Sequence, residues 1–250
     1  MPKLNLHFQR FEFKYYLPRS KADKLIPALL SHMEWDPYIK DSGKNFYKVN
    51  SLYFDNDDFG CFWDKESGIA DRKKLRFRFY GDVILPALPV FLEIKRKKDA
   101  LIIKDRIKLE ANDCFNMNLD MKLNQLFKND NDNQFLNELI WFKKRNLMKP
   151  KLYISYDRSA LVSKVDKKFR ITFDYNIKTQ LSKDFDYNFN HLKDVYPDVV
   201  VLELKYNNIL PLWFHAIIQK YQLQRFAFSK YCNSLRMVVP ELDDNNYSIK

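Results

Sequence analysis

Residues 74–80 read KLRFRFY, and their side chains alternate between basic and apolar. Successive side chains of a β-strand point to opposite faces of the sheet. Arg76 and Arg78 therefore share one face, while a leucine and two phenylalanines occupy the other. This stretch predicts a strand that packs on a hydrophobic core with one face and carries closely spaced positive charge on the other.

The same alternation recurs in five more segments, where basic residues are punctuated by single acids: 10–14, 93–95, 104–110, 170–174 and 203–205. Only Asp105 interrupts the apolar side. An ordinary half-exposed sheet would explain any one segment. Six segments of this kind favour an α+β, β-rich fold, a closed eight-stranded antiparallel β-barrel with a charged lumen and helices outside.

The predicted strands span 8–17, 46–55, 72–80, 89–97, 101–110, 151–160, 169–174 and 199–206. Helices are predicted over 20–33, 135–145, 212–221 and 229–239, with Ser20 and Ser229 as N-caps. The Asn- and Asp-rich segment 112–134 is expected to contain a loop. One domain is expected over 8–238, followed by a C-terminal tail over 239–250.

Composition excludes several classes of site. The 250 residues include four glycines, which cannot form a Walker A loop or a GxGxxG fingerprint. Three cysteines and four histidines show no metal-ligand or catalytic spacing. No stretch is long and apolar enough for a signal peptide or a membrane helix, so we expect a cytoplasmic protein.

The net charge of +11 and the clustered cations predict an anionic partner. Many cations in a space of low dielectric constant require counter-ions. Arginine binds phosphate through two parallel hydrogen bonds, and carboxylates suit a hard cation such as Mg²⁺ or Mn²⁺. A polyphosphate-like anion with a divalent metal satisfies both requirements.

Eight segments resemble, in this order, the VTC domain, a polyphosphate polymerase module among the triphosphate tunnel metalloenzymes of the CYTH-like superfamily. They are RFEFKY (10–15), SLYFD (51–55), KLRFRFY (74–80), FLEIKRK (91–97), YDRSA (156–160), RITFD (170–174), LELKY (202–206) and FSKY (228–231).

The resemblance implies a role for each matching position. The catalytic cations would be Arg76, Arg78, Lys95, Arg158, Arg170 and Lys230. Further phosphate-binding residues would be Lys14, Arg10, Lys108, Lys205 and Tyr53. Glu203 would hold the metal, with Glu12 and Glu93 as supporting acids.

The implied reaction moves the γ-phosphoryl group of ATP onto a polyphosphate chain, with Mn²⁺ or Mg²⁺ as cofactor. The superfamily signature ExExK reads Arg10-Phe11-Glu12-Phe13-Lys14 here, which favours the polymerase over a two-metal hydrolase. A triphosphatase acting on inorganic or nucleoside triphosphate and a non-catalytic polyphosphate or nucleotide binder remain alternatives.

Nucleic acid is not expected as a partner, because the aromatic residues alternate away from the cations. The sequence leaves the oligomeric state open.

Overall fold

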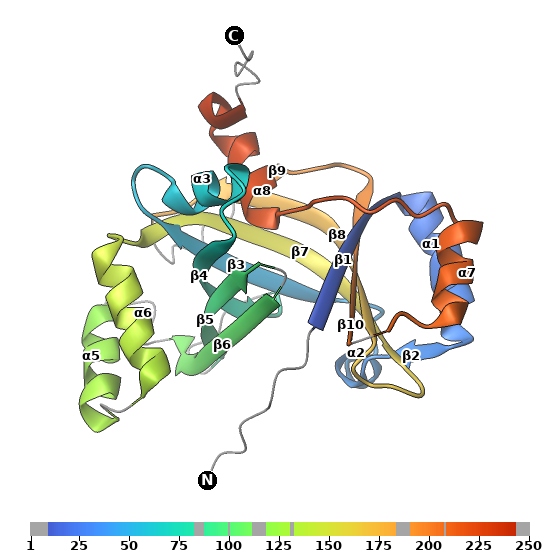
Figure 1. The fold of residues 1–250 in the computed structure, drawn as a ribbon, viewed down its shortest axis with the longest axis horizontal. Helices are drawn as coiled ribbons and strands as arrows, with labels where there is room; N and C mark the ends of the chain where they lie inside the picture. The colour runs from blue at the N-terminus through green and yellow to red at the C-terminus, as the bar shows by residue number, and fades with distance from the viewer. Residues whose placement is uncertain are drawn as a thin grey trace.

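The computed structural model describes residues 10–82, 88–99, 101–111, 119–130, 133–183, 191–207 and 209–243. Its centre is one antiparallel sheet with the strand order β1-β10-β8-β7-β3-β4-β5-β6 (Figure 1). The strands are β1 (Arg10–Pro18), β3 (Tyr47–Asp55), β4 (Asp71–Tyr80), β5 (Pro89–Lys98), β6 (Leu101–Glu110), β7 (Lys149–Ser163), β8 (Arg170–Leu181) and β10 (Val199–Asn207). Two short strands extend it, with β2 (Met33–Trp35) paired to β7 and β9 (Lys193–Asp194) paired to β8.

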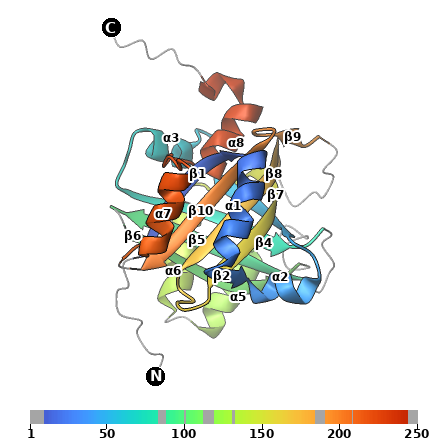
Figure 2. The ribbon, with the colours of Figure 1, turned by 90° about the vertical axis from the view of Figure 1, so that its right-hand side faces the viewer.

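The predicted β-rich fold is confirmed, with a curled antiparallel sheet inside and helices outside (Figures 1 and 2). The two end strands, β1 and β6, contact each other. Among the described strands they form no hydrogen-bonded ladder, so closure at this seam rests on side chains. An ion pair of 3.3 Å from Lys95 on β5 to Glu12 on β1 crosses the seam.

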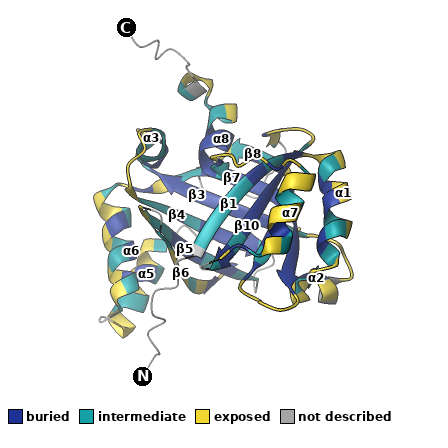
Figure 3. Cartoon of the chain, turned by 45° about the vertical axis from the view of Figure 1, so that its right-hand side comes forward, coloured by how far each residue is buried: buried dark blue, intermediate teal, exposed yellow. Residues whose placement is uncertain are grey.

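Helices cover the outer face of the sheet in two groups. Helices α1 (Arg19–Leu30) and α7 (Leu212–Lys220) lie over β1, β10 and β8, and share a core with Leu17, Leu204 and Phe173 (Figure 2). Helices α5 (Leu119–Asn129) and α6 (Gln134–Arg145) pack beside β4 and β5. The apolar side of each alternating strand therefore faces outward under helices, as predicted, and exposed residues concentrate on helices and loops (Figure 3).

Asp105, which interrupts the apolar alternation, belongs to an ion-pair network on the outer side. Arg96 on β5 pairs with Asp105 at 2.5 Å, and its Nε donates to Glu138 of α6 at 2.7 Å. Arg96 thus links Asp105 on β6 to Glu138 on α6, which explains why a charged residue stands at position 105 on the apolar side of the strand.

Several elements differ from the prediction. Helix α5, which was not predicted, occupies part of the segment expected to contain a loop, while residues 112–118 and 131–132 lie outside the described residues. Two short helices, α2 (Pro37–Ser42) and α3 (Gly60–Glu66), and the 3₁₀ turn η1 (Pro240–Asp243) were not predicted. Ser20 is not the N-cap of α1, because the helix begins directly after Pro18 and places Ser20 in its first turn.

Helix α8 (Lys230–Val238) is attached to the sheet by polar contacts. Ser229 caps it as predicted, accepting a hydrogen bond from the Cys232 backbone N–H. The Tyr231 hydroxyl donates to the fully buried Asp55 carboxylate at 2.5 Å. The other Asp55 oxygen accepts backbone N–H groups of Asn56 and Cys61, both at 2.9 Å. These bonds fix one end of α8 against β3.

No helix among the described residues has both the length and the apolar character that crossing a bilayer requires.

We predict that Tyr231→Phe lowers the free energy of unfolding by about 2 kcal/mol, because it leaves one oxygen of a buried carboxylate without its donor. Urea unfolding followed by circular dichroism measures the change. Tyr221→Phe is the matched control, since it removes only an exposed hydroxyl bond to the Lys24 carbonyl, at 3.2 Å. Equal losses in both variants would contradict an anchoring role for the Asp55 contact.

Candidate functional site

The charged side chains opposite the outer core form the inner face, defined here by eight cations and four carboxylates. The cations are Lys14, Arg76, Arg78, Lys95, Lys104, Arg158, Lys205 and Lys230, and the acids are Glu12, Glu93, Asp174 and Glu203. All four acids carry at least one cation partner. Cations outnumber acids, so the inner face has a surplus of positive charge.

One group of contacts surrounds Glu93 on β5. Arg76 donates through Nε and Nη2 to one oxygen of Glu93, at 2.9 and 2.7 Å, while Lys104 donates to the other at 3.1 Å. A third nitrogen of Arg76 donates to the Tyr53 hydroxyl at 2.9 Å. Burial opposes ionisation of Glu93, but Arg76, Arg78 and Lys104 outweigh it and lower its pKa to about 2. Glu93 is therefore ionised, and cations occupy both its oxygens.

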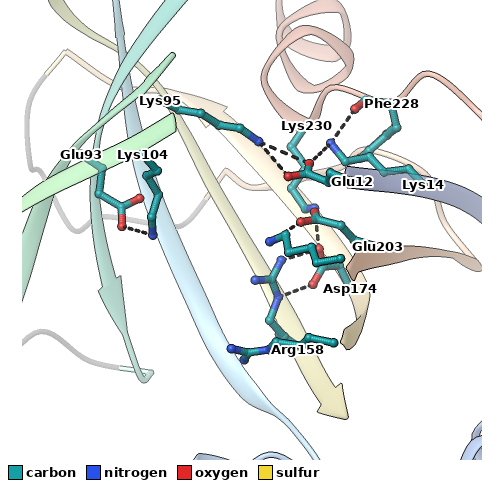
Figure 4. Close-up of polar contacts among 12 residues, drawn as sticks. Glu12, Lys14, Glu93, Lys95, Lys104, Arg158, Asp174, Glu203, Phe228 and Lys230 are labelled. Atoms are coloured by element: carbon teal, nitrogen blue, oxygen red, sulfur yellow. Dashed lines mark hydrogen bonds and ion pairs between the residues drawn. The ribbon is translucent and has the colours of Figure 1, made fainter. Parts of the chain in front are cut away.

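A second group joins β1, β10 and β5. Lys14 lies opposite Glu203 and Glu12 opposite Lys205 in the β1–β10 register. Lys14 pairs with Glu12 at 3.0 Å and also donates to the Phe228 carbonyl at 3.1 Å. Lys205 pairs with Glu203. Lys95 reaches both Glu12 oxygens at 3.3 Å, so the two carboxylates lie within one network of lysines (Figure 4).

The two acids of this network are ionised despite their burial. Burial and the Glu203 carboxylate raise the pKa of Glu12, but three lysines (Lys14, Lys95 and Lys205) outweigh them and lower it to about 2. Burial also opposes ionisation of Glu203, whose pKa is nevertheless held well below its usual range by Lys205, Lys14, Lys230 and Arg158. Glu12 and Glu203 are adjacent anionic oxygen donors at every physiological pH.

A third group is built on Asp174 of β8, which the sequence analysis did not assign to the site. Arg158 donates to both of its oxygens, at 2.6 and 2.8 Å, and Lys230 pairs with it from α8 (Figure 4). Burial opposes ionisation, but Arg158 and Lys230 lower the pKa of Asp174. Asp174 thus orients two of the predicted catalytic cations. Asp174 lies in the segment RITFD (170–174), on the same strand face as Arg170, and this alternation could have placed it in the site.

Arg78 has a different environment. Its guanidinium donates to the Ser51 and Tyr156 hydroxyls, both at 3.2 Å, and the residue is 7% exposed. Its described hydrogen-bond partners are neutral, so it is a buried cation whose charge no bonded carboxylate balances. This is the arrangement expected of a group that binds an incoming phosphate.

Three other predicted residues lie towards the margin. Arg170 pairs with Asp36 at 3.1 Å, and its Nε is buried with no partner among the described residues. Lys108 is exposed on β6, opposite Phe91 of β5. Arg10 begins β1 opposite Asn207, and its side chain lies outside the described residues.

The expected separation of aromatic residues from the cations does not hold throughout. Tyr53 and Tyr156 hydrogen-bond the inner-face arginines, and the Lys230 ammonium lies 4.9 Å from the Tyr156 ring centre. Tyr47 lies directly opposite Arg158 in the β3–β7 register. Tyrosine hydroxyls satisfy guanidinium donors without adding negative charge, which explains their place among the cations.

The surplus of cations also affects the lysines themselves. Burial lowers the pKa of Lys95 to about 8. The positive charges of Lys14 and Lys205 act in the same direction, and the Glu12 carboxylate offsets them only in part. Burial, together with Arg78 and Arg76, lowers the pKa of Lys104 to about 8 against the pull of Glu93. Both lysines therefore lose their protons as the pH rises through about 8, and an added anion would oppose that loss.

Glu12 and Glu203 fit a divalent metal better than Glu93 does. They lie on adjacent strands and supply hard oxygen donors, and a Mg²⁺-type ion takes few carboxylates and completes its shell with phosphate oxygens and water. The described residues contain no group of three or more His, Cys, Asp or Glu side chains that could hold a metal ion by themselves. The remaining ligands would therefore come from phosphate and water. Glu93 lies apart from the other two acids, beside Lys104 (Figure 4).

The model of the VTC domain family matches residues 9–239. Among proteins with curated descriptions, none matches the sequence.

Several solved structures are similar at low identity. A Bacillus halodurans protein named provisionally as an adenylate cyclase is 13% identical, with a TM-score of 0.48 over 88% of this chain and 93% of its own. A Pyrococcus horikoshii protein is 12% identical, with a TM-score of 0.45 over 91% and 98%. A Hippeastrum protein, described as having a dominant triphosphatase activity, is 14% identical, with a TM-score of 0.45 over 94% and 99%. Likeness at this level carries no argument about the chemistry of this chain.

We predict that binding of ATP at pH 8 takes up protons. An anion beside Lys95 and Lys104 raises their pKa from about 8 towards the usual value, so each binds more proton in the complex than in the free protein. Affinity should accordingly fall as the pH rises from 7 to 9. Calorimetry in two buffers of different ionisation enthalpy measures the uptake per ATP bound.

The double variant Lys95→Gln with Lys104→Gln should take up fewer protons per ATP bound. Lys128→Gln, on the exposed surface of α5, should match the unsubstituted protein. A binding heat independent of the buffer would show that neither lysine titrates on binding.

Proposed function

The chain belongs to the VTC domain family, and from this membership we propose that it is a metal-dependent polyphosphate polymerase acting on ATP. The observation that carries the proposal is the surplus of cations on the inner face, above all the buried Arg78 with neutral partners. Such a surplus is unfavourable in a buried site unless a polyanion compensates it. A linear phosphate chain carries negative charge along its length, so it can contact cations that lie on several neighbouring strands.

The phosphate contacts are proposed from the positions of the side chains. The catalytic cations would be Arg76, Arg78, Lys95, Arg158, Arg170 and Lys230, with Lys14, Lys205, Lys108, Arg10 and Tyr53 as further phosphate contacts. Glu93 and Asp174 hold Arg76 and Arg158 in fixed orientations through paired hydrogen bonds. Cations fixed before substrate arrives need no reorganisation in the transition state.

In the proposed reaction, a terminal oxygen of the polyphosphate chain attacks the γ-phosphorus of ATP. The bond between that phosphorus and the β–γ bridging oxygen breaks, and ADP leaves with the bond electrons. The chain's own residues align the two phosphates and stabilise negative charge, and no protein nucleophile is required. Glu12 and Glu203 would hold Mn²⁺ or Mg²⁺, which supplies further charge neutralisation on the transferring group.

Residues 8–238 are proposed as a single domain with a short C-terminal tail, located in the cytoplasm. Inorganic polyphosphate and triphosphate are the other proposed ligands.

We expect incubation with ATP and Mn²⁺ or Mg²⁺ to yield a ladder of polyphosphate chains together with ADP. Gel electrophoresis of the phosphate products separates the candidate functions. Orthophosphate without chains would identify a triphosphatase, in which water replaces the phosphate acceptor. No turnover with either metal, combined with tight binding of triphosphate, would leave a non-catalytic binder.

We predict that Glu203→Gln abolishes nearly all metal-dependent turnover while binding of triphosphate survives or tightens. The substitution keeps the shape of the side chain but removes the negative charge of a metal ligand. It also removes the electrostatic attraction of Glu203 for Lys205, Lys14 and Lys230, which then remain available to bind phosphate. Turnover and equilibrium binding are measured on the same preparation. Glu34→Gln is the matched control. Glu34 lies on the short strand β2 and pairs with Lys40 and Lys167, so its substitution should affect neither quantity.

Arg78→Ala should show the opposite pattern, weakening triphosphate binding as well as turnover, because it removes a direct phosphate donor. Wild-type turnover in Glu203→Gln would place the metal elsewhere. Loss of binding in Glu203→Gln, with the fold intact, would instead give Glu203 the task of orienting the lysines.

A further inference from the structure

Four aromatic residues gather where one set of strand ends meets. Tyr47 is the first residue of β3, Tyr80 is the last residue of β4, and Phe91 lies near the start of β5. Tyr38 joins them from α2, the short helix that precedes β3. Because β3, β4 and β5 are antiparallel neighbours, these ends lie at one edge of the sheet. We call Tyr38, Tyr47, Tyr80 and Phe91 the aromatic rim.

The rings of the rim touch without stacking. Tyr38 meets Tyr47 with centroids 4.9 Å apart at an interplanar angle of 78°, and Tyr47 meets Tyr80 at 5.9 Å and 65°. Tyr80 contacts Phe91 at 6.2 Å and 64°. Tyr38 is 55% exposed, and Tyr47, Tyr80 and Phe91 are only partly buried. Edge-to-face contact and partial exposure leave ring surface that a planar ligand can cover.

The cations of the inner face begin directly next to the rim. Arg158 lies opposite Tyr47, and Arg78 lies two residues before Tyr80 on the same face of β4. Two residues along a strand correspond to about 7 Å. A phosphate at Arg78 or Arg158 is therefore about one sugar unit away from the aromatic surface.

Arg170 and Asp36 connect the two regions. Arg170 Nη2 lies 3.5 Å from the Tyr47 hydroxyl and pairs with Asp36 at 3.1 Å. The other function of Asp36 is to cap α2, accepting the Tyr38 backbone N–H at 3.0 Å. The buried Nε of Arg170 has no partner among the described residues. A donor is thus left over at the boundary between the aromatic rim and the phosphate-binding cations.

We propose that the aromatic rim is a nucleobase subsite, where the base of a nucleoside triphosphate stacks on Tyr38 and Tyr80 while its phosphates lie among Arg78, Arg158 and Arg170. The inference rests on the proposed function, since it assigns the nucleotide end of the same site. Inorganic phosphate chains have no aromatic group, so the rim contributes nothing to their binding. Stacking accepts any base, because every base has a π face. The subsite therefore separates the nucleotide donor from the phosphate acceptor without selecting among bases.

The test compares ATP with inorganic triphosphate. Tyr38→Ala should weaken the binding of ATP, and of GTP, about tenfold, as expected for loss of one stacking contact. It should change triphosphate affinity by less than about twofold. Tyr38→Phe keeps the ring and should restore ATP affinity. Dissociation constants come from calorimetry with the metal present, and melting temperatures confirm that each variant is folded.

Trp141→Ala is the matched control. Trp141 is a 53% exposed aromatic side chain under Arg145 on α6, a helix on the opposite side of the molecule from α2 (Figure 1). The substitution removes a similarly exposed aromatic ring outside the site, and ATP affinity should not change.

The outcomes separate this inference from the proposed function. If the unsubstituted protein binds both ligands and Tyr38→Ala weakens neither or both equally, the subsite is wrong and the phosphate-binding function stands. If the protein binds neither ATP nor triphosphate, the proposed function and the subsite fall together. A selective loss for ATP, rescued by phenylalanine, is the result that supports the subsite.

Discussion

The structure depends on holding buried carboxylates among a larger number of cations, most of them partly buried, on the inner face of one sheet. Isolated charges in such a place are strongly unfavourable, so each acid there is bonded by one or more cations. Glu93 and Asp174 hold arginines through paired hydrogen bonds, whereas Glu12 and Glu203 are held by lysines. The acids offset part of the positive charge and orient its side chains, and the cations in excess favour anionic ligands.

The difference between the two kinds of acid has a chemical consequence. An arginine bound at two points to a carboxylate is rigid and charged at all accessible pH values. Lysine pairs are point contacts that exchange partners easily, and burial already lowers the pKa of Lys95 to about 8. The arginine-bound acids therefore suit a permanent framework, while Glu12 and Glu203 can exchange lysines for other cations. This supports placing a metal at Glu12 and Glu203 and not at Glu93.

Alternation along single strands was enough to predict the sheet, because a period of two is set by the backbone and survives any tertiary context. It located Arg76, Arg78, Glu93 and Glu203 on one face before any contact was known. Helix α5 was missed because its Asn and Asp content suggested a loop, although Leu119, Leu123 and Leu126 have helical spacing. Pairings such as Arg158 with Asp174, and the convergence of Tyr38 and Tyr80, depend on long-range register that one sequence does not encode locally.

Lys95 connects closure of the sheet to the chemistry proposed for it. Its ion pair with Glu12 crosses the seam between β6 and β1, where the described strands have no hydrogen-bonded ladder. The same ammonium is a predicted phosphate ligand, and the same carboxylate is a predicted metal ligand. An arriving phosphate attracts Lys95 and an arriving divalent cation attracts Glu12, so the two ligands together replace one internal ion pair with two external ones. Neither ligand alone supplies a new partner to both groups: with phosphate alone Glu12 keeps its ion pair with Lys14, and with metal alone Lys95 loses its carboxylate. Anion and metal binding should therefore be coupled through this single contact.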